Sequence, residues 1–324
     1  MTRLLIFEPS FRLIEGQLAE LGVEAVVVDR QGGLGSEAEP DIGWFSGELY
    51  RQPAARALVR AALASSRMQW FHSAAAGFDD PFFARLVAKG VRLSTSHGQA
   101  VGMADYALAG VLDHFQRGPE RRAAQAEGAW RSLPFREVNG SSWLIVGFGA
   151  VGQGVAARAR AFGARIVGVR RDQSPHPGAD AIAALADLPR LLPEADVVLL
   201  SAPLSAATRH LADAGFFAAM KEGSVLVNVG RGALVDEAAL LGALEKGRPA
   251  HAVLDVFETE PLAPESPFWR HPRVSLSAHC SGVTGAQDGR NRDLFVDNLR
   301  RWLDGQPLLY EVDPHDLLAP AQAI

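Results

Sequence analysis

Three motifs in the second half of the chain carry side chains of the kinds that acid–base chemistry uses. They are NVGRG, which contains Arg231, DVFETEP, which contains Glu260, and SAHCSG, which contains His279. Each follows an apolar run that reads as a buried parallel strand. Ligands of open α/β sheets bind beyond the carboxyl ends of the strands, so we expect a site at the edge of the sheet where these three strands end.

Each of the three residues also has a simpler explanation when it is taken alone. Arg231 could be a structural ion-pair partner, Glu260 a loop carboxylate before Pro261, and His279 a histidine that merely ends a strand. Their order and spacing after the glycine-rich turn GFGAVG at 147–152 favour the functional interpretation. Cys280, beside His279, is expected to be a packing residue rather than a nucleophile.

A glycine-rich turn precedes these motifs and predicts a cofactor site. The apolar run 143–146 leads into GFGAVG, and residues 153–162 read as a helix ended by Gly163. The first glycine permits a tight turn, the second a close approach to a pyrophosphate, and the third close helix packing. With the next strand at 165–169, the pattern indicates a dinucleotide site, in which the helix start binds the diphosphate. Its residues are Gly147, Phe148, Gly149, Ala150, Val151 and Gly152.

The end of the following strand indicates which dinucleotide binds. An acidic residue there would bind the ribose hydroxyls of NAD, whereas arginine suits the 2′-phosphate of NADP. Arg170 occupies that place and Arg171 follows it, so we expect NADP to be preferred and NAD to be the alternative. In that alternative, both arginines are solvated and Asp172 serves NAD.

Composition excludes several classes of protein. The 324 residues suit about two domains, and a net charge of −5 provides no basic surface for nucleic acid. No apolar run is long enough for a membrane span, and no signal-peptide core precedes Glu8, so a cytoplasmic protein without a membrane partner is expected. The single cysteine excludes an internal disulfide and a multi-cysteine metal site.

Strands and helices alternate along the whole chain, which indicates an α/β protein with two doubly wound parallel-sheet domains. We expect a Rossmann cofactor domain at 99–286, inserted into a flavodoxin-like substrate domain formed by 1–98 and 287–324. The expected strands are 4–7, 25–28, 42–45, 70–71, 91–94, 143–146, 165–169, 197–200, 225–229, 252–256 and 274–277. The expected helices are 11–21, 53–64, 81–88, 101–115, 153–162, 211–219, 237–245 and 286–304.

The ordered set of glycine loop, NVGRG, DVFETEPL and a late histidine resembles the D-isomer-specific 2-hydroxyacid dehydrogenase family, which includes glyoxylate and hydroxypyruvate reductases. The resemblance implies that Arg231, Glu260 and His279 are catalytic, and that Asp255 binds the nicotinamide carboxamide. It places Ala202 and Pro203 at the adenosine side and implies a homodimer formed through the cofactor domain. We further assign Met103, Val229 and Gly230 to the cofactor site.

Such an enzyme transfers a hydride between NAD(P)H and a small 2-keto or D-2-hydroxy acid. Here His279 would donate the proton, Glu260 would favour the imidazolium, and Arg231 would bind the substrate's carboxylate and carbonyl oxygens, so that no metal is required. Glyoxylate or hydroxypyruvate is the expected substrate. The alternative from another class is a non-catalytic protein that senses dinucleotides or acts as a co-regulator.

Two further features bear on the substrate. The motif SAAAGFD at 73–79 resembles the family's SAGVD loop, which implies that Ala76 and Gly77 bind the substrate carboxylate through backbone N–H groups. Ala278 stands where the family usually has proline, and CSG follows the histidine in place of an apolar residue and two glycines. These departures leave the identity of the substrate open.

Overall fold

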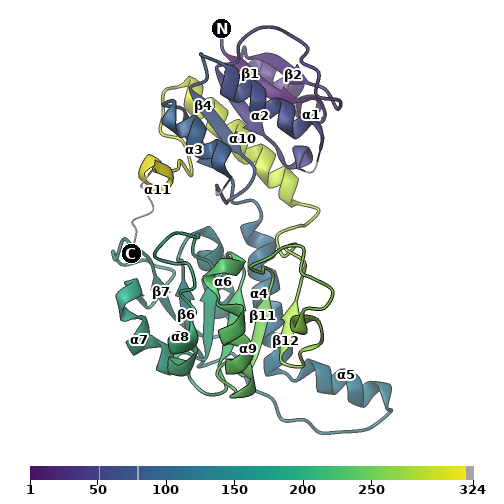
Figure 1. Cartoon of the computed structure of the whole chain (residues 1–324), viewed down its shortest axis with the longest axis vertical. Helices are drawn as coiled ribbons and strands as arrows, with labels where there is room; N and C mark the ends of the chain where they lie inside the picture. The colour runs from purple at the N-terminus through teal and green to yellow at the C-terminus, as the bar shows by residue number, and fades with distance from the viewer. Residues whose placement is uncertain (51, 79, 319–324) are drawn as a thin grey trace. The chain divides into compact units, whose positions relative to one another are not determined.

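The computed structural model describes residues 1–50, 52–78 and 80–318, except for the side chains of residues 316 and 318. The chain divides into two compact units (Figure 1). Unit 1 consists of Met1–Gln99 and the residues from Thr284 onwards, and unit 2 consists of Ala100–Val283. Asp79 of the SAAAGFD motif and the last six residues of the predicted substrate domain lie outside the described residues.

Unit 1 is built on a five-stranded parallel sheet with the order β2-β1-β3-β4-β5. This is the flavodoxin-like order that the fold prediction requires. The strands are β1 (Arg3–Phe7), β2 (Glu24–Val28), β3 (Ile42–Phe45), β4 (Trp70–Ser73) and β5 (Arg92–Thr95). The helices are α1 (Glu8–Glu20), α2 (Ala54–Ala64), α3 (Pro81–Ala88), α10 (Gln287–Leu303) and α11 (Pro314–Leu318).

Helix α10 returns from unit 2 and is anchored in unit 1 by aromatic packing. Its Phe295 is fully buried and stacks on Trp44 of β3, with ring centroids 4.2 Å apart. The same ring packs against Trp70 of β4 at 5.8 Å. These large apolar surfaces make α10 an integral part of the unit 1 core.

Unit 2 is built on a seven-stranded parallel sheet with the order β12-β11-β10-β9-β6-β7-β8. The strands are β6 (Ser142–Val146), β7 (Arg165–Val169), β8 (Ala181–Ala183), β9 (Val197–Leu200), β10 (Val225–Asn228), β11 (His251–Leu254) and β12 (Val274–Leu276). The helices are α4 (Ala100–Phe115), α5 (Gly118–Ala126), α6 (Ala150–Ala161), α7 (Leu188–Leu191), α8 (Ala214–Ala219) and α9 (Glu237–Glu245). The chain order reverses direction in the sheet between β6 and β9, which is where dinucleotides bind in such folds.

Several elements differ from the sequence prediction. Helix α6 begins at Ala150, three residues before the predicted start, since the glycine turn itself forms its first turn. Helix α8 begins later than predicted, because the side chain of Asp213 accepts a hydrogen bond from Phe216 N at 2.8 Å and caps it. Helix α5 was not predicted, because it buries only Ala124 and so shows no apolar stripe.

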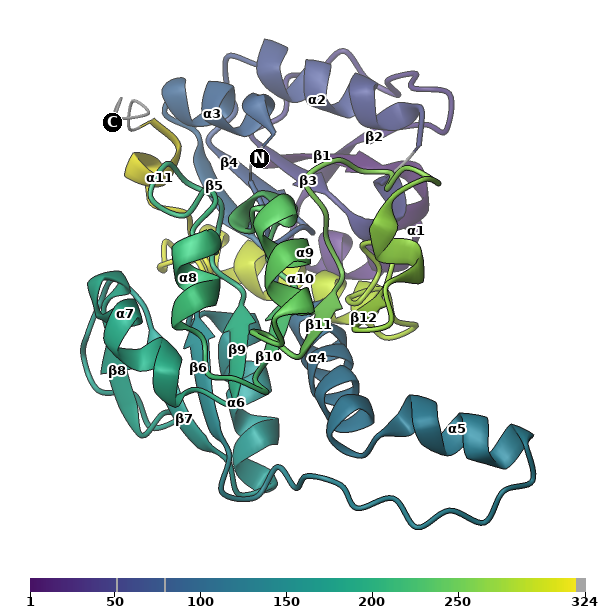
Figure 2. The ribbon, with the colours of Figure 1, turned by 60° about the horizontal axis from the view of Figure 1, so that its bottom comes forward.

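Helix α5 and the irregular segment 127–137 extend away from the body of unit 2 (Figure 2). Trp130 in this segment is fully exposed and Phe135 is 51% exposed. Of the helices in the described part of the chain, none is both long and apolar enough to cross a membrane.

Candidate active site

All seven strands of unit 2 are parallel, so their carboxyl ends lie at one edge of the sheet. The chain leaves this edge at Gly147 after β6, at Arg170 after β7, at Ser201 after β9, at Val229 after β10 and at Asp255 after β11. Most of the residues predicted for the site therefore share one edge.

His279 and Glu260 form a direct pair in the structure. His279 Nδ1 lies 2.7 Å from Glu260 Oε2, and the other carboxylate oxygen accepts a hydrogen bond from Phe257 N at 3.0 Å. An ionised carboxylate only accepts hydrogen bonds, so with an ionised Glu260 this contact requires the proton on Nδ1 and leaves Nε2 as the nitrogen that faces away from the carboxylate. The side chains are 52% and 34% exposed, which leaves the imidazole accessible.

Arg231 stands at the start of the loop that follows β10. Its guanidinium donates a hydrogen bond to Gly230 O at 2.9 Å, and its own carbonyl accepts one from Asn228 Nδ2 at 3.0 Å. A Cβ at Gly232 would overlap the carbonyl of Phe257, so only glycine allows this loop to lie against the Glu260 loop. The close approach brings the loop of the predicted arginine next to that of the histidine–glutamate pair.

Asp255 is 2% exposed, and its carboxylate bonds to the loop that carries His279. Oδ1 accepts from Ser277 Oγ at 2.5 Å, from Cys280 N at 2.9 Å and from Ser281 N at 3.0 Å, and Oδ2 accepts from Ser281 Oγ. The predicted contact of Asp255 with the nicotinamide carboxamide stays a prediction. Within the described part of the chain, the hydrogen bonds to this carboxylate come from residues 277–281.

The glycine turn has the shape of a diphosphate cradle. Gly147 has φ +96°, and a Cβ on it would overlap the backbone of Ser201 and Ala202. A Cβ on Gly152 would overlap the carbonyl of Gly147, whereas one on Gly149 would meet no described atom within 4 Å. Among the described side chains none caps α6, so its first N–H groups are available to an anion. The open space at Gly149 and this helix start fit a bound diphosphate.

The neighbouring predicted residues contribute mainly backbone to this edge. Ser201 Oγ donates to Gly147 O at 2.8 Å and ties the turn at Ala202 and Pro203 to the glycine loop. Val229 N bonds to Leu200 O, and Gly230 lies against the carbonyl of Ala202.

The ring of Phe148 is buried against Gly168, so this residue can offer only its backbone to a cofactor. Ala150, Val151 and Gly152 form the first turn of α6, and Met103 lies half-buried on α4.

Arg170 and Arg171, at the end of β7, lie in a turn that is held by hydrogen bonds with Ser174. Arg170 donates to Ser174 O at 2.8 Å and lies 3.6 Å from Asp172, and its side chain is 23% exposed. Asp172 accepts hydrogen bonds from Ser174 N at 2.9 Å and from Ser174 Oγ at 2.6 Å. These bonds from Ser174, with a smaller effect of Arg170, lower the pKa of Asp172. Arg171 is exposed on the same turn.

Ala76 and Gly77 belong to unit 1, where they lie in the turn after β4 and are half-buried. The turn is held by Ala74 N, which bonds to Phe45 O at 2.8 Å, and by Ser96 N, which bonds to Ala75 O at 3.1 Å. Their contact with a substrate carboxylate stays a prediction.

Sequence reasoning missed Ser277, Ser281 and Tyr106. The two serines bond to Asp255, and Tyr106 of α4 donates a hydrogen bond to Leu254 O at 2.9 Å. Burial raises the pKa of Tyr106 to about 12, against the effect of a hydrogen bond with Ser277. The signal in the sequence was Ser281, which stands in the segment CSG that departs from the family pattern, and its partner Asp255 could not be read from spacing.

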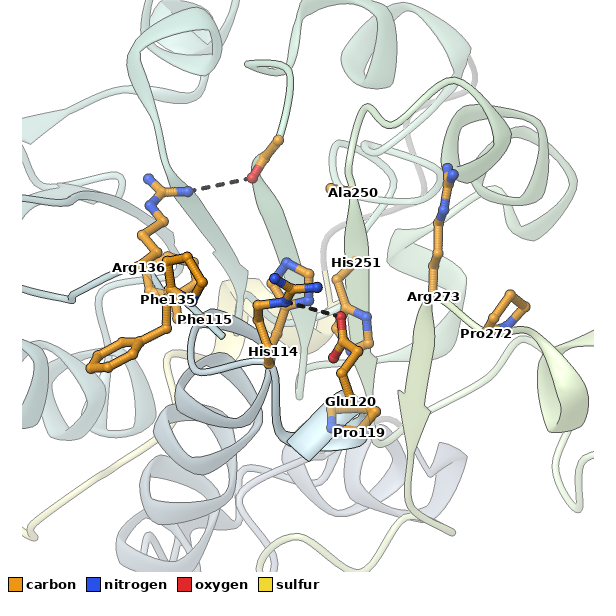
Figure 3. Close-up of a pocket in the computed structure, with 13 residues that line it drawn as sticks. His114, Phe115, Pro119, Glu120, Phe135, Arg136, Ala250, His251, Pro272 and Arg273 are labelled. Carbon is orange, nitrogen blue, oxygen red and sulfur yellow. Dashed lines mark hydrogen bonds and ion pairs between the residues drawn. The ribbon is translucent and has the colours of Figure 1, made fainter. Parts of the chain in front are cut away.

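A pocket of about 720 Å³ lies at the opposite, amino-terminal edge of the unit 2 sheet (Figure 3). Its walls include His114 and His251, whose rings stack with centroids 4.5 Å apart. Burial lowers the pKa of His251 to about 4 and also lowers that of His114. Arg136 in the wall pairs with Asp196 at 2.5 Å and lies over the ring of Phe115. The pocket contains none of the predicted catalytic residues.

Comparison with known proteins agrees with this geometry. The sequence model of the D-isomer specific 2-hydroxyacid dehydrogenase NAD binding domain matches residues 108–281. A glyoxylate/hydroxypyruvate reductase A from Salmonella newport is 31% identical over 216 residues, which are 67% of this chain and 69% of that protein.

Two solved structures extend the similarity to both units. A D-isomer specific 2-hydroxyacid dehydrogenase from Xanthobacter autotrophicus Py2, in complex with NADPH and MES, has a TM-score of 0.80 and 26% identity over 98% of this chain and 99% of that chain. An NADPH-dependent glyoxylate/hydroxypyruvate reductase from Sinorhizobium meliloti, in complex with NADP and sulfate, has a TM-score of 0.77 and 26% identity over 98% and 100%. The chain therefore belongs to the D-isomer specific 2-hydroxyacid dehydrogenase family, the NAD(P)-dependent oxidoreductases whose cofactor domain its second unit matches.

Proposed function

We propose that this protein reduces a small 2-keto acid to the D-2-hydroxy acid. Glyoxylate and hydroxypyruvate are the leading substrates of this proposal. The observation that carries the proposal is the 2.7 Å pair of His279 Nδ1 and Glu260 Oε2, with Glu260 held in turn by Phe257 N. The relative from Salmonella and the solved reductase from Sinorhizobium support the choice of substrate.

The proposed roles follow from the chemistry of the side chains. Glu260 stabilises the imidazolium of His279 and holds the ring, so that Nε2–H can protonate the keto oxygen. In the oxidative direction, neutral Nε2 accepts the hydroxyl proton. Arg231 binds the carboxylate and polarises the carbonyl of the substrate. Bound NADPH would supply the hydride.

We also propose a preference for NADP(H). Arg170 and Arg171 follow β7, where the adenosine ribose would lie. Asp172, the residue that could serve NAD instead, is already engaged by two hydrogen bonds from Ser174. The NADPH and NADP that are bound in the two solved relatives support the same choice.

The decisive experiment follows the oxidation of NADPH and of NADH with a panel of 2-keto acids. We expect turnover with glyoxylate and hydroxypyruvate, and faster turnover with NADPH than with NADH. Faster turnover with NADH would contradict the role of the arginines. Tight binding of NADPH without turnover of any keto acid would favour the alternative, a non-catalytic dinucleotide sensor. His279→Ala should lose roughly 100-fold or more in kcat, as removal of a general acid does.

We further propose a homodimer formed through unit 2. The exposed ring of Trp130 and the half-exposed ring of Phe135 lie on the segment that extends from this unit, and large exposed aromatic side chains are typical of protein interfaces. Light scattering coupled to size-exclusion chromatography measures the oligomeric state directly, and a monomer at micromolar concentration would refute the proposal.

A further inference from the structure

Most of the described hydrogen bonds of the loop that carries His279 converge on one buried residue, Asp255. Ser277 N donates to Leu254 O at 2.9 Å and continues the ladder between β11 and β12 by one residue. His279 N then donates to Asp255 O at 2.8 Å. Beyond that point the chain turns around the carboxylate, which accepts from donors on both sides of the histidine.

Asp255 is a rigid anchor for this loop. Its N–H donates to Asn228 O at 3.0 Å on the central strand β10, and 2% of its surface is exposed. Oδ1 accepts three hydrogen bonds, from Ser277 Oγ, Cys280 N and Ser281 N, and Oδ2 accepts one from Ser281 Oγ. A carboxylate with this many internal donors holds the loop, because these charge-assisted hydrogen bonds are about twice as strong as neutral ones.

The backbone of His279 explains why such an anchor is needed. Its φ is +51°, in the left-handed region that a non-glycine residue rarely adopts. This conformation turns the next two N–H groups, those of Cys280 and Ser281, toward the same oxygen of Asp255, which is the geometry of an anion-binding nest. The anion therefore stabilises the conformation that presents the imidazole to Glu260.

We propose that Ser281 is a positioning residue for His279: its hydroxyl fixes the Asp255 carboxylate, which holds residues 277–281 in the conformation that aims the imidazole at Glu260. Ser277 fixes the other side of the same carboxylate. This role differs from the predicted contact between Asp255 and the nicotinamide carboxamide. The inference rests on the proposed function of His279 as the proton donor.

The first test is a set of variants at Ser281 measured in two backgrounds. Ser281→Ala should lower kcat with the best 2-keto acid by roughly tenfold or more, since small displacements of a catalytic group have large costs. The Kd of NADPH should stay within about twofold, and Ser281→Thr should restore kcat because it keeps the hydroxyl. In a His279→Ala background, Ser281→Ala should have no further effect, because the serine acts through the histidine.

Three outcomes would overturn the proposal. They are an unchanged kcat in Ser281→Ala, an equal fall of kcat in the His279→Ala background, and a weakened Kd of NADPH with kcat preserved, which would assign the carboxylate to the cofactor. Val283→Ala is the matched control, since it truncates an exposed side chain of the same segment. Its kcat should equal that of the unaltered protein.

The second test needs no turnover, so it separates failure of this inference from failure of the proposed function. Amide hydrogen exchange of residues 277–283 is compared between the unaltered protein, Ser281→Ala and Ser277→Ala. Faster exchange of the His279, Cys280 and Ser281 amides in both variants supports the anchor, even if no keto acid is reduced. Unchanged exchange in both variants would overturn it. Unchanged thermal midpoints would show that the variants are folded.

Discussion

Glu260→Gln is the sharpest perturbation of the proposed site, because it removes a charge without removing volume. In the native pair, one oxygen of Glu260 accepts from Phe257 N and the other from His279 Nδ1. Glutamine has only one oxygen. If that oxygen keeps the bond from Phe257 N, the amide N–H₂ group faces Nδ1, so the imidazolium meets a donor instead of an acceptor.

The size of the effect follows from the exposure of the pair. A hydrogen bond to a charged group contributes about 1.5–3 kcal/mol. The two side chains are 52% and 34% exposed, so solvent screens the interaction and the lower end, about 1.5 kcal/mol, applies. Since about 1.4 kcal/mol corresponds to tenfold, kcat near neutral pH should fall about tenfold.

The assay compares kcat of Glu260→Gln with that of Glu258→Gln across the neutral pH range, with the Kd of NADPH measured separately by fluorescence. Glu258 is the matched control, because it lies in the same loop but accepts a hydrogen bond from Glu237 N and pairs with His210 at 3.1 Å. We expect the control to retain its kcat and both variants to bind NADPH normally. A kcat for Glu260→Gln equal to that of the control at every pH would refute the assigned role.

The remaining predictions concern the cofactor turn, the unit 1 core and the oligomeric state. Gly147→Ala should lower the free energy of unfolding by about 1–2 kcal/mol or more, because φ is +96° and the Cβ overlaps the Ser201–Ala202 backbone. Gly149→Ala should leave thermal stability unchanged and weaken only NADPH binding, so equal melting temperatures of the two variants would contradict this distinction. Burial, and to a smaller extent the charge of His97, lowers the pKa of His72 to about 3. His72 therefore binds fewer protons in the folded state than in the unfolded state between about pH 6.5 and pH 3. The contribution of its neutral imidazole to the free energy of unfolding is fully present above pH 6.5 and should fall by roughly 1 kcal/mol between about pH 6 and pH 5. Denaturant titrations of His72→Phe should show a weaker fall over this range, and a parallel fall would assign the effect to other groups. Trp130→Asp should shift the proposed homodimer toward monomer in analytical ultracentrifugation, and an unchanged sedimentation coefficient would exclude Trp130 from the interface.

Much of the fold follows from local patterns. Near-continuous apolar runs at 143–146, 197–200 and 225–229 predict central strands, because a strand buried on both faces has few polar side chains, and β6, β9 and β10 lie there. The glycine turn was recognisable because its glycines have fixed tasks. Helix α5 was not predicted, since a mostly exposed helix has no apolar stripe, and β8 was missed because three residues carry too little signal.

The candidate site divides in the same way. The types and order of Arg231, Glu260 and His279, and the family that they indicate, could be read from the sequence by itself. The pairing of Nδ1 with Oε2 and the hydrogen bonds from Ser277 and Ser281 to the Asp255 carboxylate depend on two loops that follow the paired parallel strands β11 and β12. Hydrogen-bond partners separated by about 20 residues or more leave no periodic trace in a sequence. Only the tertiary structure therefore decided which oxygen meets which donor.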